Sequence, residues 1–172
     1  MSNIIRTLGL YQPYAGLMLP PWNKIETRWV RAHRKPPFPL GKYLIYSCLK
    51  SYHPEEVDSI AGNTINDELW GTIANTEVFN LCGFAIGIGD LVEVRKMEPV
   101  DQEKAFVKVD GDILSRDLCY TIEDGDTEEL KTYIRYCLIF KNMQRIKPFH
   151  FKGKQGIGFL NEADLKKIDI IH

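Results

Sequence analysis

Short runs of β-branched and aromatic residues, separated by prolines and glycines, constrain the fold more than any other feature of this chain. The clearest run is KYLIYSCL at residues 42–49, and comparable runs occupy residues 5–10, 24–30, 84–97 and 133–151. Such runs predict strands, since branched and aromatic side chains pack well on a pleated surface. Because the runs do not alternate strictly with helices, a small barrel is favoured over a doubly wound sheet.

Short helices are predicted between and after these strands. Pro13 suits a first helical turn, and Asn161 suits the residue that caps a helix at its N-terminus. The predicted helical segments are residues 12–19, 53–62, 65–78, 127–134 and 161–168. The run at 133–151 is interpreted as a pair of strands. The expected fold is therefore α+β, a small β-barrel of five to seven strands with peripheral short helices.

Three glycines (Gly83, Gly87 and Gly89) interrupt the pattern around the run at 84–97. Glycines inside a strand predict a bulge or a close approach of another segment, as occurs where a small barrel bends. The stretch GIGDLVEV lacks the GxGxxG spacing and no helix is expected to follow it. A dinucleotide-binding loop is therefore not favoured.

Length and composition point to an ordinary soluble domain. The 172 residues suit one domain, and 26% of them are charged. No apolar run of about 18 residues is present, and the N-terminus lacks the pattern of a signal peptide. The four cysteines form no CxxC pair and none has a histidine at ligand spacing. We therefore expect reduced thiols, a cytoplasmic location, no membrane contact, and neither a metal nor a cofactor.

The formal net charge of −1 hides a strong segregation of charge. Residues 24–35 contain five basic residues and one acid, and residues 141–154 contain five basic residues and no acid. Residues 98–129 contain eleven acids and three basic residues. Such segregation can create a positive face on a nearly neutral protein, although charge runs are more often simply solvated surface.

Common catalytic motifs are missing from the sequence. It contains no GxSxG and no HExxH, and its four histidines are scattered. The two basic stretches do mix cations with aromatic residues, as Trp29 beside Arg28 and as Phe151 beside Lys152. Phosphates are bound by Arg and Lys, and unstacked bases by aromatic faces. One interpretation is that these stretches contact nucleic acid. The other is that the tryptophans belong to the core and the lysines are simply solvated.

The stretch NKIETRWV, residues 23–30, alternates charged with apolar or neutral residues. In a strand, Lys24, Glu26 and Arg28 would share one face. That face is either a solvated edge, on which Glu26 and Arg28 form an ordinary ion pair, or the floor of a site.

Five blocks of the sequence occur in a recognisable order. They are LGLYQPYAGLML, NKIETRWV, GKYLIYS, GFAIGIGDLVEV and KPFHFKGKQGI. In order and approximate spacing they resemble an ASCH (activating-signal-cointegrator homology) domain. The resemblance covers nearly the whole chain except the acidic stretch. It implies a PUA-like β-barrel over residues 1–172, with an acidic insertion at about 98–129 and a cleft that binds RNA or other nucleic acid.

The signature of that family resembles GxKxxExR. It matches Glu26 and Arg28, but its glycine position falls on Pro21 and its lysine position on Asn23. Lys24 is one residue late, and one step along a strand reverses the direction of a side chain.

Some small bacterial relatives are amidohydrolases of acetylated cytidine. Those relatives use a lysine, a threonine and a later carboxylate. The resemblance places these three positions on Asn23, Glu26 and Asp90 of this sequence. Asparagine neither titrates nor attacks. Lys24 and Thr27 form a similar pair that is out of register by one residue, so Lys24, Thr27 and Asp90 are the candidate catalytic residues of this alternative.

The leading prediction is a nucleic-acid-binding module, without catalysis, that holds RNA in a cleft between the first helix and the strand at 24–30. Arg28 would contact a phosphate or a base edge, and Glu26 would orient it. The predicted binding residues are Gln12, Lys24, Glu26, Arg28, Trp29, Arg31, Lys152 and Lys154. A third reading is a protein-interaction domain whose acidic insertion meets a basic partner.

Overall fold

The structure is a computed structural model that describes residues 4–51, 65, 67–106, 119–124, 127–153 and 157–171, with the backbone alone for 119–124 and 127–132. Its strands are β1 (Arg6–Gln12), β2 (Glu26–Arg31), β3 (Gly41–Ser51), β4 (Phe84–Lys96), β5 (Cys119–Asp124), β6 (Thr127–His150) and β7 (Gly158–Phe159). The α-helices are α1 (Tyr14–Leu17), α3 (Asp67–Ala74), α4 (Gln102–Ala105) and α6 (Glu162–Leu165). Two 3-10 turns, η1 (Glu77–Asn80) and η2 (Pro99–Asp101), complete the described elements.

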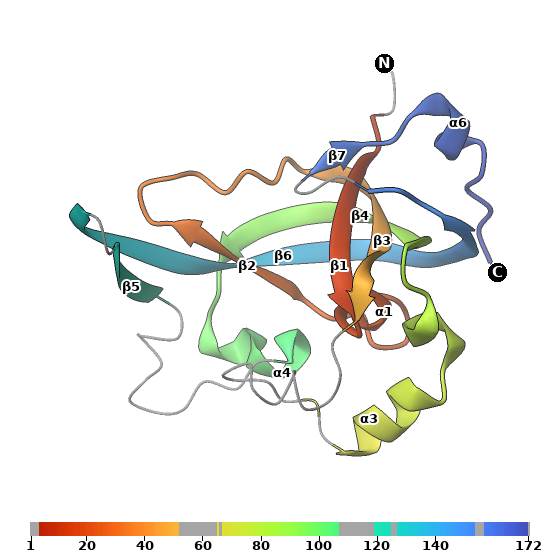
Figure 1. The fold of residues 1–172 in the computed structure, drawn as a ribbon, viewed down its shortest axis with the longest axis horizontal. Helices are drawn as coiled ribbons and strands as arrows, with labels where there is room; N and C mark the ends of the chain where they lie inside the picture. Colours follow the sequence, from red (N-terminus) through yellow and green to blue (C-terminus); the bar gives the residue numbers. More distant parts are fainter. Residues whose placement is uncertain are drawn as a thin grey trace.

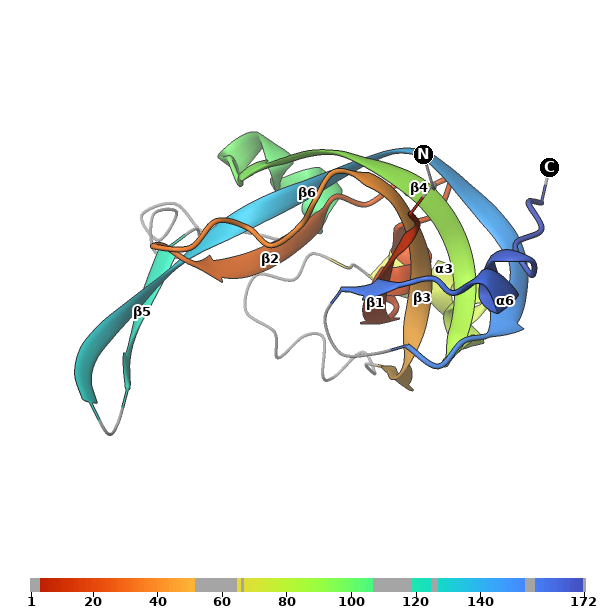
Figure 2. The same ribbon diagram turned by 90° about the horizontal axis from the view of Figure 1, so that it is seen from above.

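One strongly bent sheet dominates the molecule (Figures 1 and 2). Six strands follow the order β2-β6-β4-β3-β1-β7, and β5 pairs with β6 outside that path. Among the strand pairs of the described residues, β1 and β3 run parallel and the other pairs are antiparallel. The α+β class and the number of strands agree with the prediction. The barrel is not confirmed, because the described ladder begins at β2, ends at β7 and does not return.

Two glycines let β4 bend as predicted. The pairing of β4 with β6 shifts register between Ala85 and Gly87 and again between Ile88 and Asp90. A Cβ atom at Gly87 would collide with Leu19, and one at Gly89 would collide with Met143. The prediction of bulges and close approaches in this run is confirmed.

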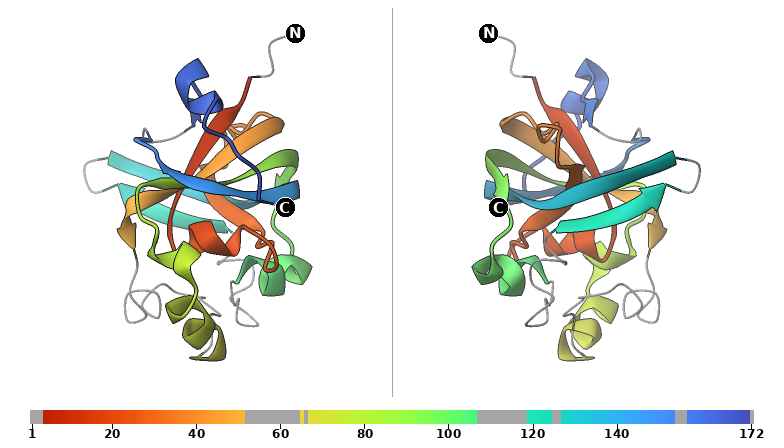
Figure 3. Two further views of the ribbon diagram at one scale, coloured as in Figure 1. Left: turned by 90° about the vertical axis from the view of Figure 1, so that its right-hand side faces the viewer. Right: turned by 90° about the vertical axis from the view of Figure 1, so that its left-hand side faces the viewer.

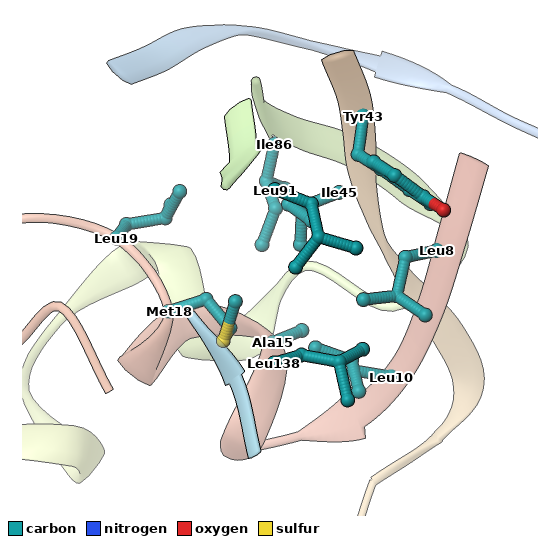
Figure 4. Packing of buried hydrophobic residues seen from close by; sticks show 10 residues of the cluster. All are labelled: Leu8, Leu10, Ala15, Met18, Leu19, Tyr43, Ile45, Ile86, Leu91 and Leu138. Atoms are coloured by element: carbon teal, nitrogen blue, oxygen red, sulfur yellow. The ribbon is translucent and has the colours of Figure 1, made fainter. Parts of the chain in front are cut away.

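The main core lies where α1 packs against the bent sheet (Figure 4). Ala15, Met18 and Leu19, which come from α1 and its end, meet buried residues of four strands, β1, β3, β4 and β6. Those strand residues are Leu8, Leu10, Tyr43, Ile45, Ile86, Leu91 and Leu138. A second cluster, around Leu44 and Ile146, is formed by other side chains of β3, β4 and β6 together with Ile5. The α1 segment is therefore held from several sides, which makes the chain just after it a well-defined starting point for β2.

The helices gather at two ends of the sheet. Helices α1, α3 and α4 lie together at one end, and α6 lies at the other beside β7 (Figures 1 and 3). Within the described ranges, no helix has both the length and the apolar character needed to cross a membrane.

Two of the helix predictions are confirmed in whole or in part, and a third is not tested. The C-terminal helix is confirmed as α6, where the Asn161 side chain accepts a hydrogen bond from the Asp164 backbone N–H at 2.8 Å. The segment 65–78 contains α3, but the helix ends at Ala74 before η1 begins. The helix predicted at 53–62 lies outside the described residues.

The prediction of a helix at 127–134 is wrong, and so is the prediction of two strands at 133–151. Both segments belong to the single 24-residue strand β6. The acidic residues near its start resemble a helical first turn, but pairing with β5 supplies partners for the backbone groups there. Long-range pairing has therefore overridden the local helical preference.

Candidate functional site

Two backbone hydrogen bonds place the residues that lead into β2. The Lys24 N–H donates to the Leu17 carbonyl at 2.9 Å, and the Ile25 N–H donates to the Lys104 carbonyl at 2.9 Å. Asn23, just before them, has a positive φ of 45° and turns the chain sharply. These contacts tie the start of β2 to α1 on one side and to α4 on the other.

Lys24, Glu26 and Arg28 form a compact ion-pair triad. The Lys24 Nζ lies 3.0 Å from Glu26 Oε2, and the Arg28 Nε lies 3.1 Å from Glu26 Oε1. The side chains of Lys24 and Glu26 are 4% and 7% exposed, whereas that of Arg28 is 35% exposed. Lys24 Nζ also donates to the Ile25 carbonyl at 3.0 Å and lies 5.4 Å from the centre of the Tyr14 ring. Arg28 is thus the member of the triad that reaches solvent.

The charged face of β2 points into the protein. Glu26, Arg28 and Val30 alternate along the strand, and both Glu26 and Val30 are buried. Thr27, Trp29 and Arg31 therefore lie on the other face, where Trp29 is exposed. The predicted charged face exists, but it is not a solvated edge. Although Lys24 precedes the strand, its long side chain still reaches Glu26.

The environment of Glu26 favours its ionised form. Burial raises the pKa of this carboxyl, but the nearby cations Lys24 and Arg28 outweigh burial and leave the pKa below its usual value. With Glu26 ionised, two cations surround one carboxylate and the triad carries one excess positive charge. Because Lys24 is buried, that excess is presented to solvent at Arg28.

Arg28 also links the two strands β1 and β2. Its Nη2 donates to the Gly9 carbonyl of β1 at 3.3 Å. Its buried Nε is close to Glu26 but makes no well-aligned hydrogen bond. In the described part of the chain, β1 beyond Thr7 has a strand partner on one side only, which is β3. The Arg28 side chain therefore connects two strands that no ladder joins.

Tyr46 is a residue of this region that the sequence reasoning missed. A Cβ atom at Gly9 or at Gly153 would collide with the Tyr46 ring, so the ring lies against both glycines. Burial raises the pKa of Tyr46, and Arg28 acts in the opposite direction. The alternation within KYLIYSCL could have placed Tyr46 on one face of β3, but only the fold brings that face to Gly9 and Gly153.

The other predicted binding residues are dispersed. Trp29 and Arg31 lie on the opposite face of β2 from Glu26, with the Arg135 guanidinium 5.2 Å from the centre of the Trp29 ring. Lys152 is exposed on the segment after β6, next to Gly153. Lys154 lies outside the described residues.

Gln12 is fully buried and its side chain is occupied by internal hydrogen bonds. Its Nε2 donates to the carbonyls of Val78 and Leu81 at 2.9 and 3.1 Å, and its Oε1 accepts from the Gly16 N–H at 3.0 Å. These bonds join the end of β1 to α1 and η1. Gln12 therefore stabilises the arrangement of β1, α1 and η1 next to the site.

The three candidate catalytic residues do not come together. Lys24 is paired with Glu26, whereas Thr27 faces the other side of β2 and accepts from Arg135 Nε at 3.2 Å. Asp90 lies on β4, with Lys42 Nζ at 2.8 Å and Asn142 Nδ2 at 3.0 Å. Hydrogen bonds from Lys42 and Asn142 lower the pKa of Asp90. Each candidate is thus engaged by a different partner.

Comparison with known proteins gives a structural similarity without close sequence relatives. No family model and no curated protein matches the chain. Similar solved structures include the ASCH protein of Zymomonas mobilis, with a TM-score of 0.44, 14% identity, and coverage of 95% of this chain and 92% of that one. A tyrosine-to-phenylalanine mutant of that protein has a TM-score of 0.44 and 12% identity, and the match covers 95% of this chain and 94% of that one. A serine-to-alanine mutant has a TM-score of 0.45 and 13% identity, with 96% of this chain and 94% of that one covered.

The similar structures are ASCH proteins. They come from the family that the five sequence blocks resemble. Because the TM-scores lie below 0.5, no residue role is transferred from them. The contacts of this chain alone support the site at Arg28.

Proposed function

We propose that this chain is a nucleic-acid-binding module for single-stranded RNA, with Arg28 as its central contact. The observation that supports this function is the ion-pair triad, in which Glu26, itself paired with the buried Lys24, holds the partly exposed Arg28 while one excess positive charge remains. A guanidinium that is fixed in place loses little conformational freedom on binding and presents its remaining donors in a planar fork. Such a fork suits phosphate oxygens or the edge of a base.

The proposed position lies beside Arg28, where this side chain links β2 to β1. The cleft between the first helix and the strand is not retained, because Lys24 is hydrogen-bonded to Leu17 and lies against Tyr14 there. Tyr11 follows Gly9 by two residues on β1 and is 42% exposed. An exposed aromatic ring on the strand that Arg28 contacts suits an unstacked base beside its phosphate.

The barrel prediction takes a modified form within this proposal. We propose that the sheet is a barrel with one open seam, between β1 and β2, that the Arg28–Gly9 hydrogen bond bridges. A ligand at Arg28 would then contact both edges of the seam. The single domain, its acidic insertion at about 98–129 as a contact for a protein partner, and a cytoplasmic location all stay predictions. Part of the insertion, residues 107–118 and 125–126, lies outside the described residues.

The test is binding of a short, fluorescently labelled single-stranded RNA of mixed sequence to the purified chain. Arg28→Ala should weaken binding about tenfold or more, since a specific arginine contact contributes roughly 1–3 kcal/mol and about 1.4 kcal/mol corresponds to tenfold. If Arg28 contacts a phosphate, the slope of log affinity against log salt should also fall by about one. Arg28→Lys should keep part of the affinity, because it retains the charge without the fork.

Lys166→Ala provides the matched control. Lys166 is an exposed cation after α6, at the end of the molecule away from β2, and its loss changes the net charge by the same amount. Its affinity for RNA should stay within about twofold of the wild type, because an isolated exposed charge contributes little. Unchanged RNA affinity in Arg28→Ala together with a lowered melting temperature would show that Arg28 only joins the two strands. DNA of the same sequence tests the preference for RNA.

A further inference from the structure

The face of β2 that lies opposite the triad is covered at one end and open at the other. Residues directly opposite each other in a sheet share a face. On this face β2 and β6 contribute three cross-strand pairs, which are Thr27–Cys137, Trp29–Arg135 and Arg31–Tyr133. Cys137 is buried in a cluster with Met97 and Ala105, whereas Trp29 is 36% exposed. The chain around α4 therefore covers the beginning of this face and leaves the end near Trp29 open.

Arg135 is held in place beside the Trp29 ring. Its Nε donates to Thr27 Oγ1 at 3.2 Å, and its guanidinium carbon lies 5.2 Å from the centre of the ring. A guanidinium this close to an indole is attracted by the ring, so the contact holds both side chains. Most charge runs on a protein surface are merely solvated. This pair differs from them, because it combines a positioned arginine with an exposed ring.

Positive charge continues beyond Trp29 along the chain. Arg31 is half-buried at the end of β2, and its carbonyl accepts from the Arg34 N–H at 2.8 Å in the turn that follows. Arg34 and Lys35 are exposed in this turn, as is His33. Residues 29–40 contain three basic residues, one histidine and no acid. The exposed ring therefore lies beside a short cationic segment.

We propose that the open face around Trp29 and Arg135, together with the turn at 31–35, is a second surface for single-stranded nucleic acid. A base stacks on the Trp29 ring, while the guanidinium of Arg135 and the cations of the turn contact phosphates. Rings bind bases that are unstacked, and cations bind phosphates; a single strand offers both, and a duplex offers only phosphates. An acidic protein segment would satisfy the cations and leave the ring without a partner.

This second surface is separate from the position proposed at Arg28. Trp29 and Arg28 point to opposite faces of β2, so one nucleotide cannot contact both. The inference rests on the proposed function for the class of ligand, and it adds a surface on the other side of the strand. A longer nucleic acid should therefore bind more tightly than a short one, because it can contact both surfaces at once.

The experiment compares labelled single-stranded RNAs of about four and about twelve nucleotides, lengths within the usual range of single-strand sites. Trp29→Ala should reduce the advantage of the longer strand about fivefold or more, which is the lower end of what a stacked base contributes. Trp29→Phe should keep most of that advantage, because it retains a ring. A photoreactive thiouridine in the longer strand should form a crosslink to a peptide that contains Trp29.

Salt dependence tests the turn. The double variant Arg34→Ala/Lys35→Ala should lower the slope of log affinity against log salt by about 1.4 for the longer strand, since each phosphate contact to a single strand contributes about 0.7. The matched control is Lys147→Ala/Lys166→Ala, which removes the same charge from exposed positions near α6. The control should leave the slope unchanged. Melting temperatures check that all variants fold.

Three results would overturn the inference. Trp29→Ala and the turn variant could bind both RNAs as the wild type does, the control could lower the slope as much as the turn variant, or duplex RNA could bind as tightly as the single strand. The two proposals fail in different ways. A loss in Arg28→Ala alone would refute only the second surface, and a loss confined to the Trp29 and turn variants would refute only the contact at Arg28. A wild-type chain that binds no RNA would refute both.

Discussion

Replacing Glu26 with glutamine should destabilise the protein strongly, because it removes the negative charge between two cations. The side chain of Glu26 is 7% exposed, and that of its partner Lys24 is 4% exposed. Removing one partner of a buried ion pair costs about 3–5 kcal/mol, since the other charge is left without compensation in a dry environment. Arg28 is 35% exposed and can be hydrated by solvent, so most of the cost falls on Lys24.

The expected loss lies near the lower end of that range, about 3 kcal/mol, because the glutamine oxygen still accepts a hydrogen bond from Lys24. For a chain of this size, each kcal/mol lowers the melting temperature by about 2–4 °C, which gives a fall of about 6–12 °C. Urea unfolding followed by tryptophan fluorescence measures the free energy of unfolding, and the m-value checks that both states remain comparable.

A double-mutant cycle with Lys24→Met separates the ion pair from other effects of the substitution. The double variant has no buried lysine left to compensate, so it should be more stable than the sum of the single losses predicts, by about 1–3 kcal/mol. Free energies that add within about 0.5 kcal/mol would contradict the coupling. A loss below about 1 kcal/mol in Glu26→Gln would show that Lys24 is hydrated and that the triad is not buried as described.

Two further predictions concern pH and glycine. The pKa of Glu26 is lower in the folded chain than its usual value of about 4.5, so its contribution to stability is present above about pH 4.5 and is lost as the pH falls through the folded-state pKa. The difference in melting temperature between wild type and Glu26→Gln should therefore shrink below about pH 4.5. Gly9→Ala should destabilise the chain, because the added Cβ atom would collide with Tyr46. Gly71→Ala in α3 should instead stabilise the chain by about 0.5–1 kcal/mol, because its Cβ atom meets no atom within 4 Å and alanine favours a helix. Equal effects of the two substitutions on thermal unfolding would refute the packing argument.

Local sequence determined most of the strands and the C-terminal helix. Alternation and β-branched residues placed β1, β2, β3 and β4 close to their observed bounds, because these signals depend only on neighbours along the chain. Asn161 likewise capped α6 as predicted, since a cap hydrogen bond spans only a few residues. Local sequence could not predict that the start of β6 is a strand, because the pairing of this segment with β5 decides between helix and strand there.

In the candidate site, too, the sequence determined some features and the tertiary structure decided the others. The alternation of Glu26 and Arg28 determined that they share a face of one strand. The tertiary structure decided that this face points inward, that Lys24 reaches Glu26 from outside the strand, and that Arg28 meets Gly9 of β1. Gln12, which was predicted to bind a ligand, became a buried support, because segments distant in the sequence supply its partners. Burial and charge pairing arise only when such segments meet, and a strand pattern carries no information about which segments those are.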